Sequence, residues 1–120
     1  MDLADLPGRP CPVAAALELV GDRWSLLVVR EVDLGSHRFT EIQRGTGAPR
    51  DRVAARLKAL VDGGILRREQ YSDAPERFGY HLTDAGQELV PVLRSLYAWG
   101  ARWACAPGPG TAPEPRPARA

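Results

Sequence analysis

The chain has 120 residues, of which 44% are hydrophobic and 26% are charged, and its formal net charge is +1. These values are typical of one globular domain with a single hydrophobic core. No run of about 18 apolar residues occurs, so we expect no membrane-spanning helix. The acidic N-terminus lacks the apolar stretch of a secretory signal, and we therefore expect a cytoplasmic protein whose two cysteines are reduced.

Charge is distributed unevenly along the chain. Residues 1–35 hold three arginines and six acidic residues, whereas residues 36–58 hold six basic and two acidic residues. A basic segment inside a nearly neutral domain is typical of a surface that binds an anionic partner. The same charges would also suit a solvated pair of helices, and charge alone does not separate the two interpretations.

The first two predicted helices cover residues 11–21 and 22–32. Apolar side chains repeat at helical spacing in both, and Gly21 separates them. Asp22 is the expected N-cap of the second helix, because its carboxylate can accept from the N–H groups of the first turn. The apolar faces consist of Val13, Leu17 and Val20 in the first helix, and of Trp24, Leu27, Val28 and Val32 in the second.

A short helix and a longer basic helix follow. Residues 38–45 predict a helix with Phe39 and Ile42 facing inward and its end at Gly45. Pro49 suits the first position of the next helix, since its missing N–H would lack a partner there anyway. The buried stripe of that helix consists of Val53, Leu57, Leu60 and Val61.

The opposite face of this helix, which runs to Asp62, has small residues in its centre and long basic residues around it. Its members are Asp51, Arg52, Ala55 and Ala59, with Arg56 and Lys58 on the flanks. Such a surface can approach another body closely.

A β-hairpin is predicted next. Residues 65–72 and 77–83 have the composition of strands, and the polar, proline-containing stretch 73–76 is the turn between them.

Thr83 or Asp84 can cap a final helix that continues to residue 104, and Pro91 should bend this helix or loosen its first turns. Two apolar rows are present: one holds Leu89, Leu93, Leu96 and Gly100, and the other holds Val92, Trp99 and Trp103. One row can cover the core of the domain. The second row needs another partner, which we expect to be a second copy in a symmetric dimer; the alternative is the N-terminal helix of the same chain.

This order of elements is that of a winged helix-turn-helix, an α+β fold that is mainly α. Residues 45–49 would form the corner of the helix-turn-helix. In that geometry the second helix of the pair enters the major groove of DNA by its N-terminal end, where Arg50, Asp51 and Arg52 lie. The positive end of the helix dipole also favours nearby phosphates.

Most of the chain carries a combined pattern, which consists of CPVAAALELVGDRWSLLVVREV, RFTEIQR, GAPRDRVAARLKALVDGGILRR, ERFGYHLTDAG and LVPVLRSLYAWGARW. Together these segments, from Cys11 to about Trp103, resemble the HxlR-type transcriptional regulators, a subgroup of the MarR-like winged-helix proteins. The resemblance implies a homodimer that binds an inverted-repeat operator in double-stranded DNA and represses or activates transcription. It also implies a dimer interface on the first and last helices, with the candidates Val13, Leu17, Leu96, Trp99 and Trp103.

The resemblance places the recognition helix at about Pro49 to Asp62. Arg50 and Arg52 are candidates for contact with base edges or phosphates, because an arginine fork can bind guanine O6 and N7 together, worth ~1–3 kcal/mol of discrimination. Asp51 could accept from a cytosine N4, or restrain a neighbouring arginine and favour the helix N-terminus. Arg56 could reach a phosphate or lie along the domain surface.

Further DNA contacts are expected from the preceding helix and the wing. Arg38 and Thr40 suit backbone phosphates, which set register without carrying sequence information. Arg77, near the wing tip, would reach the minor groove or its phosphates. In the alternative interpretation Arg77 pairs with Asp73 and Glu76 on the surface.

The two cysteines allow more than one interpretation. Cys11 lies just before the first helix, where the dipole could favour its thiolate. Some HxlR-type regulators sense oxidants or electrophiles through a cysteine at this position, so the resemblance makes Cys11 a possible redox sensor. A single cysteine is also commonly a small buried hydrophobe. Cys105 could be a resolving partner across a dimer, or only the start of the tail.

Nothing in the sequence favours an enzyme. The cysteines and histidines occur singly, without metal-ligand spacing, and no phosphate loop, nucleophile motif or paired carboxylates occur. We therefore expect no catalytic residues, no metal and no cofactor.

The predicted division is a flexible N-terminal arm (1–10), the winged helix-turn-helix domain (11–104) and a disordered proline-rich tail (105–120). The leading hypothesis is a sequence-specific DNA-binding regulator. The alternative is a winged-helix module that binds an acidic protein and has no specific DNA binding.

Overall fold

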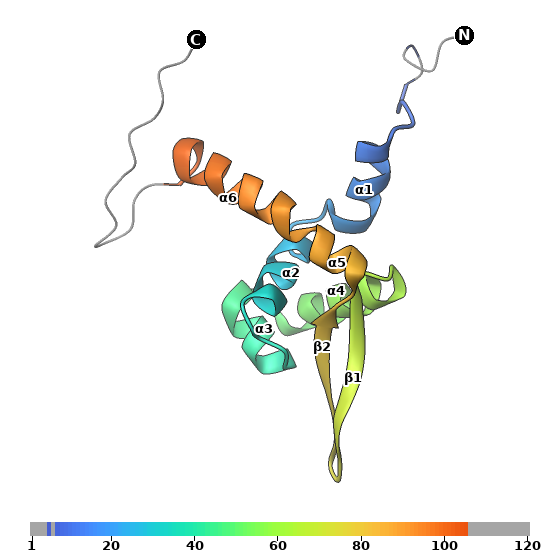
Figure 1. Cartoon of the computed structure of the whole chain (residues 1–120), viewed down its shortest axis with the longest axis vertical. Helices are drawn as coiled ribbons and strands as arrows, with labels where there is room; N and C mark the ends of the chain where they lie inside the picture. Colours follow the sequence, from blue (N-terminus) through green and yellow to red (C-terminus); the bar gives the residue numbers. More distant parts are fainter. Residues whose placement is uncertain (1–4, 6, 106–120) are drawn as a thin grey trace.

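The computed structural model describes residue 5 and residues 7–105. Its elements are α1 (Pro12–Val20), α2 (Ser25–Asp33), α3 (Phe39–Thr46), α4 (Arg50–Asp62), β1 (Leu66–Asp73), β2 (Glu76–Leu82), α5 (Asp84–Glu88) and α6 (Val90–Trp103). In Figure 1, α2, α3 and α4 form a central body, the hairpin extends from one end of it, and α1 and α6 project from the other. This is the predicted winged helix-turn-helix. The rest of the predicted arm and tail lies outside the described residues.

The core lies where α2, α3 and α4 meet the base of the hairpin. Its buried members are Val20, Val28, Val29, Val32, Ile42, Ala48, Val53, Leu57, Leu60, Ile65 and Leu66. The predicted stripe of α4 is confirmed, with Val61 half-buried at its edge. In α2, the sequence pattern missed Val29, which is fully buried, whereas Leu27 is only half-buried.

The corner between α3 and α4 differs from the prediction. Helix α3 does not end at Gly45 but continues to Thr46, and Gly47 caps it in the left-handed region, with φ of 71°. Gly45 lies inside the helix against the carboxyl group of the buried Glu31, where an added Cβ would overlap with that side chain. The close packing of α3 on α2 therefore requires a glycine at position 45. The left-handed residue that ends the helix, which the sequence predicted at Gly45, is Gly47.

Helix α4 begins one residue later than predicted, at Arg50, so Pro49 lies just before the helix. Pro49 is the N-cap of α4 rather than its first helical residue, and its carbonyl accepts from the N–H groups of Arg52 and Val53 at 3.0 and 3.1 Å. Its φ of −59° and ψ of 149° lead the chain into the helix from an extended backbone. The first turn of α4 therefore begins at Arg50.

The hairpin is antiparallel, with Leu66 opposite Leu82 at its base and an irregularity between Gln70 and Ser72. The segment before α3 is bound to it through His37. The carbonyl of His37 accepts from the N–H of Tyr80 at 2.8 Å, and its Nδ1 lies 2.8 Å from the carbonyl oxygen of Tyr80. This two-way link holds the base of the wing against the helical body.

The final helix is divided in two, and the prediction of one continuous helix was wrong. Helix α5 ends at Glu88, and α6 begins at Val90 with Pro91 in its first turn. The cause is Pro91, because proline has no N–H for the carbonyl four residues earlier and its ring clashes with that carbonyl. The predicted cap is confirmed: the hydroxyl of Thr83 accepts from the N–H of Gly86 at 3.2 Å.

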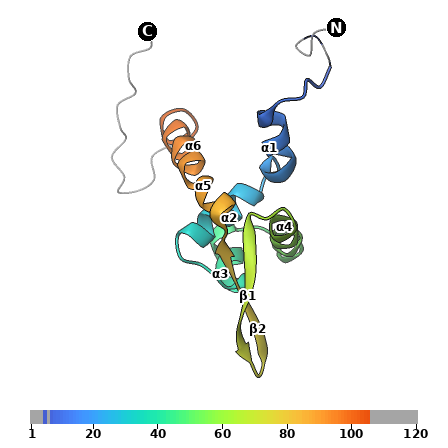
Figure 2. The ribbon, with the colours of Figure 1, turned by 45° about the vertical axis from the view of Figure 1, so that its right-hand side comes forward.

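Helices α1 and α6 leave most of their apolar side chains exposed. They diverge from each other in both views (Figures 1 and 2), so α1 does not cover the second apolar row of α6. Leu89 and Leu93 pack against the core, as predicted for one row. The exposed fractions of the outer residues are 67% for Val13, 57% for Leu17, 48% for Leu96 and 61% for Trp99. None of the described helices is long and apolar enough to cross a membrane.

Candidate nucleic-acid interface

The N-terminal end of α4 presents the predicted basic residues to solvent. Arg50, Asp51 and Arg52 are exposed, because Val53 and Leu57 hold the opposite face of the helix in the core. The guanidinium of Arg50 lies 4.9 Å from the centre of the Phe39 ring. Among the described residues, no ion pair joins Asp51 to either arginine. The expected restraint of a neighbouring arginine by Asp51 is therefore not seen as an ion pair, and its carboxylate is exposed in the first turn of α4.

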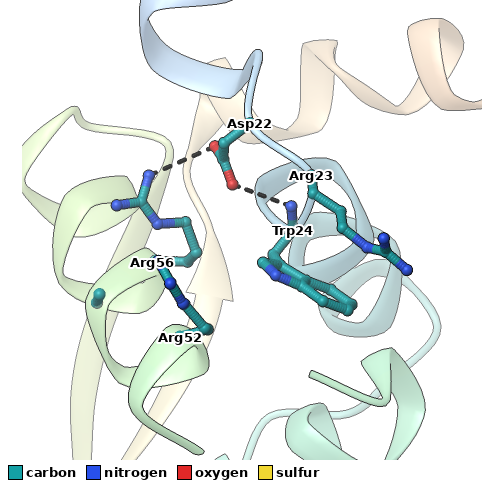
Figure 3. Close-up of a pocket in the computed structure, with 6 residues that line it drawn as sticks. Asp22, Arg23, Trp24, Arg52 and Arg56 are labelled. Carbon is teal, nitrogen blue, oxygen red and sulfur yellow. Dashed lines mark hydrogen bonds and ion pairs between the residues drawn. The ribbon is translucent and has the colours of Figure 1, made fainter. Parts of the chain in front are cut away.

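Asp22 connects α4 to the start of α2. Its Oδ2 accepts from the backbone N–H groups of Trp24 and Ser25 at 2.9 and 3.0 Å, and its Oδ1 accepts from the Ser25 hydroxyl. Although α2 begins at Ser25, later than predicted, Asp22 still satisfies its first N–H groups. The same carboxylate lies 3.4 Å from Nη1 of Arg56. Figure 3 marks this ion pair with a dashed line between the start of α2 and α4. Arg56 thus lies along the domain surface.

The pKa of Asp22 is lowered. Burial alone would raise it, but the hydrogen bonds from the Ser25 hydroxyl and from the N–H groups of Trp24 and Ser25, together with the charge of Arg56, outweigh burial. The folded state therefore favours the ionised carboxylate.

The start of α3 is connected to the wing. The N–H of Arg38 donates to Oε1 of Glu41 at 3.2 Å, and the Arg38 guanidinium lies 4.9 Å from the centre of the Tyr71 ring on β1. Thr40 is exposed in the first turn of α3. The structure therefore places Arg38 between the helix-turn-helix and the wing, where it contacts both.

Arg77 lies beside the tip of the wing and is exposed, opposite Ser72. Within the described ranges, neither Asp73 nor Glu76 forms an ion pair with it, and the Asp73 carboxylate accepts from Nε2 of Gln70 at 2.8 Å. The alternative interpretation of Arg77 as a local ion-pair residue is therefore not the arrangement observed.

Cys11 is the N-cap of α1. Its Sγ accepts from the N–H of Ala14 at 3.3 Å, and the side chain is exposed rather than buried. Cys105 follows α6 and is also exposed. The interpretation of Cys11 as a buried hydrophobe is therefore wrong.

Two histidines meet at the base of the wing. The rings of His37 and His81 are stacked with centroids 4.4 Å apart. Burial lowers the pKa of His81, and His37 and Arg67 lower it further against the opposing effect of Glu69. In the part of the chain that is described, no group of three or more side chains could hold a metal ion. The pair belongs to the contact between His37 and β2.

A cleft that the sequence patterns did not predict lies beside α4. Asp22, Arg23 and Trp24 form one wall and Arg52, Ala55 and Arg56 the other, around a volume of about 260 Å³ (Figure 3). The Arg23 guanidinium lies 4.7 Å from the centre of the Trp24 ring. The consecutive residues Asp22, Arg23 and Trp24 form one wall, but their sequence alone does not indicate a cleft, because the residues of the other wall are about 30 positions away.

Comparison with known proteins identifies the family. The protein-family model described as HxlR-like helix-turn-helix matches residues 19–107 of this chain. The chain belongs to the HxlR-like helix-turn-helix family. Mb3122 of Mycobacterium bovis, named an uncharacterized HTH-type transcriptional regulator, is 46% identical over 88 residues, which are 73% of this chain and 56% of that protein. This HxlR-like chain therefore spans just over half the length of that relative.

Solved structures have the same fold as this HxlR-like chain. The crystal structure of PA1607 gives a TM-score of 0.74 at 35% identity, covering 92% of this chain and 84% of that one. The redox regulator HypR in its oxidized form gives a TM-score of 0.69 at 30% identity, covering 80% of this chain and 100% of that one. The winged-helix assignment therefore rests on both the elements and their arrangement.

The lowered pKa of Asp22 predicts a pH-dependent contribution to stability. Because the folded pKa lies below that of the unfolded chain, the contribution is complete above about pH 4 and is lost as the pH falls through the folded value. Asp22→Ala should therefore cost about 1 kcal/mol of unfolding free energy near pH 6, and less near pH 3. Urea unfolding at both pH values measures this difference.

Asp33→Ala is the matched control, because it removes an exposed carboxylate at the far end of α2, where no N–H groups need a cap. A cost for Asp22→Ala that is the same at both pH values would contradict a role for the ionised carboxylate.

Proposed function

We propose that this chain is a homodimeric DNA-binding regulator that acts in the cytoplasm on an inverted-repeat operator in double-stranded DNA. The observation that carries the proposal is the exposed N-terminal end of α4, with Arg50 and Arg52 in its first turn. The Gly47 corner precedes it, and a wing with an exposed arginine stands beside the same helical body. This is the arrangement in which a recognition helix enters a major groove.

Arg50 and Arg52, at the N-terminal end of α4, differ in how freely their guanidinium groups can contact DNA. Arg52 has no ion-pair partner among the residues that the structure describes, so its fork can turn toward a base edge. Arg50 is stacked on Phe39, which restrains its guanidinium while leaving the N–H donors at its edge available. We assign base reading to Arg52, and either base or phosphate contact to Arg50.

Further contacts with DNA are proposed for α3 and the wing. Arg38 and Thr40 lie at the start of α3 and suit phosphates, while Arg77 at the wing suits the minor groove or its phosphates. Arg56 already pairs with Asp22, so its main role is to hold α4 against α2.

A homodimer is supported by the exposed apolar surfaces of α1 and α6. Val13, Leu17, Leu96 and Trp99 are each about half exposed or more, and Trp103 is half-buried. Two-fold pairing would remove these side chains from water and would present two copies of α4 to successive turns of DNA, about 34–36 Å apart. The two-fold symmetry of such a dimer would require an inverted repeat, and the distance between the two recognition helices would set the spacing of its half-sites.

Dimerisation through α6 predicts a specific effect of charge on that helix. Trp99→Glu should give a monomer in sedimentation experiments in which the wild type is a dimer, because a buried unpaired carboxylate opposes association. Leu34→Glu, at an apolar residue that follows α2 and is at least as exposed as Trp99, should remain dimeric. A wild-type protein that is monomeric at micromolar concentration would contradict the proposal.

DNA reading by Arg52 predicts a selective loss of affinity. An operator is first selected from a random duplex pool, and anisotropy then gives Kd for the operator and for an unrelated duplex. Arg52→Ala should raise Kd for the operator about 5- to 150-fold, and that for unrelated DNA much less. Lys58→Ala is the matched control, because Lys58 lies further along α4 and pairs with Asp62 at 2.8 Å.

Two outcomes would count against this assignment. An equal loss on both duplexes would make Arg52 a phosphate contact. Absence of binding by the wild type at low salt, where counterion release favours any DNA complex, would instead favour the protein-interaction module.

A second function, redox sensing by Cys11, is supported by one observation: its thiol is exposed at a helix N-terminus and accepts an N–H there. HypR, which has the same fold, is named a redox regulator. Oxidation by hydrogen peroxide would convert the thiol to a sulfenic acid and release water. The modified side chain would change the start of α1 and hence the proposed dimer.

Sensing by Cys11 predicts that mild peroxide releases the wild type from its operator and leaves Cys11→Ser bound. Serine is a good N-cap, so this variant should retain α1. Cys105→Ser tests whether a second thiol is needed. If wild type and Cys11→Ser respond alike, or if neither responds, Cys11 is not the sensor.

A further inference from the structure

The cleft between the start of α2 and one side of α4 contains more positive charge than its own contacts neutralise. It is lined by three guanidinium groups and one carboxylate. The carboxylate, Asp22, already accepts from Trp24 and Ser25 and pairs with Arg56 at 3.4 Å. Across the described ranges, no ion pair neutralises Arg23 or Arg52. Because Arg52 is assigned to a base, Arg23 is the cation that remains for a ligand of the cleft.

Arg23 is held in position by an aromatic ring. Its guanidinium lies 4.7 Å from the centre of the Trp24 ring, and that ring packs against the core. Stacking occupies the face of a guanidinium and leaves the N–H donors on its edge available. Arg23 is thus a restrained cation with unused donors, which reduces the entropy cost of binding an oxyanion.

The position of the cleft indicates which oxyanion it binds. Arg52 belongs both to the N-terminal end of α4 and to the wall of the cleft, and Ala55 beside it leaves space. In Figure 3, Arg52 and Arg56 face Trp24 across the cleft, and the strands of the wing lie behind α4. A helix in a major groove has a phosphate backbone along each side, and the cleft flanks α4 on the side that faces the start of α2.

We propose that this cleft binds a phosphodiester of the operator backbone, with Arg23 as the phosphate contact and Trp24 as its positioning residue. This inference rests on the proposed DNA binding. It adds a contact at the start of α2 to those of the helix-turn-helix and the wing. Because the ligand is a phosphate, the contact strengthens binding to every sequence and does not select among them.

The test measures Kd for the selected operator and for an unrelated duplex over a range of salt concentrations. Arg23→Gln should raise both Kd values by a similar factor, about tenfold, and should reduce the slope of log K against log salt by about one. Arg23→Lys keeps the charge and should recover the slope and most of the affinity. Urea unfolding confirms that both variants are folded.

Ethylation interference supplies a second readout. A phosphate whose ethylation weakens the wild type should have no effect on Arg23→Gln, because the contact is already lost. Unchanged affinity and slope in Arg23→Gln would overturn the inference, as would a loss confined to the operator or one that lysine does not recover. If the wild type binds no duplex at all, the proposed function fails and this inference fails with it.

Discussion

The burial of one face of α4 is the constraint on which the rest of the interface depends. Val53, Leu57 and Leu60 are almost completely buried between α2, α3 and the base of the hairpin. Each such side chain contributes about 1.5–3 kcal/mol relative to an exposed one, so a rotation of α4 about its axis would be strongly unfavourable. The orientation of Arg50 and Arg52 toward solvent follows from that burial and needs no contact of its own.

Asp22 adds a second constraint. One carboxylate completes the N-terminus of α2 and also holds Arg56 on α4, so the two walls of the cleft are joined at one side chain. Because this carboxylate pairs with Arg56, it forms no ion pair with Arg23 or Arg52 in the described part of the chain. The cap, the ion pair and the phosphate cleft are therefore parts of one arrangement.

Features that depend only on residues close together in the sequence could be predicted from it. The stripe of α4, the hairpin and the Thr83 cap could all be predicted, because hydrophobic spacing and capping chemistry are local. The predicted end of α3 was wrong because Gly45 and Gly47 are both plausible stops, and only the contact of Gly45 with Glu31 on α2 distinguishes them. Pro91 was recognised as a disturbance, but whether it bends or divides a helix depends on packing around it. The cleft was missed since its walls are distant in the sequence.

The central claim is that Arg52 at the N-terminal end of α4 reads a base of the operator. A base-substitution scan of the selected operator, measured with wild type and with Arg52→Ala, tests it most directly. The account predicts one position in each half-site, a guanine, at which substitution costs the wild type about 1–3 kcal/mol and costs Arg52→Ala almost nothing. Identical sequence profiles for the two proteins would contradict it.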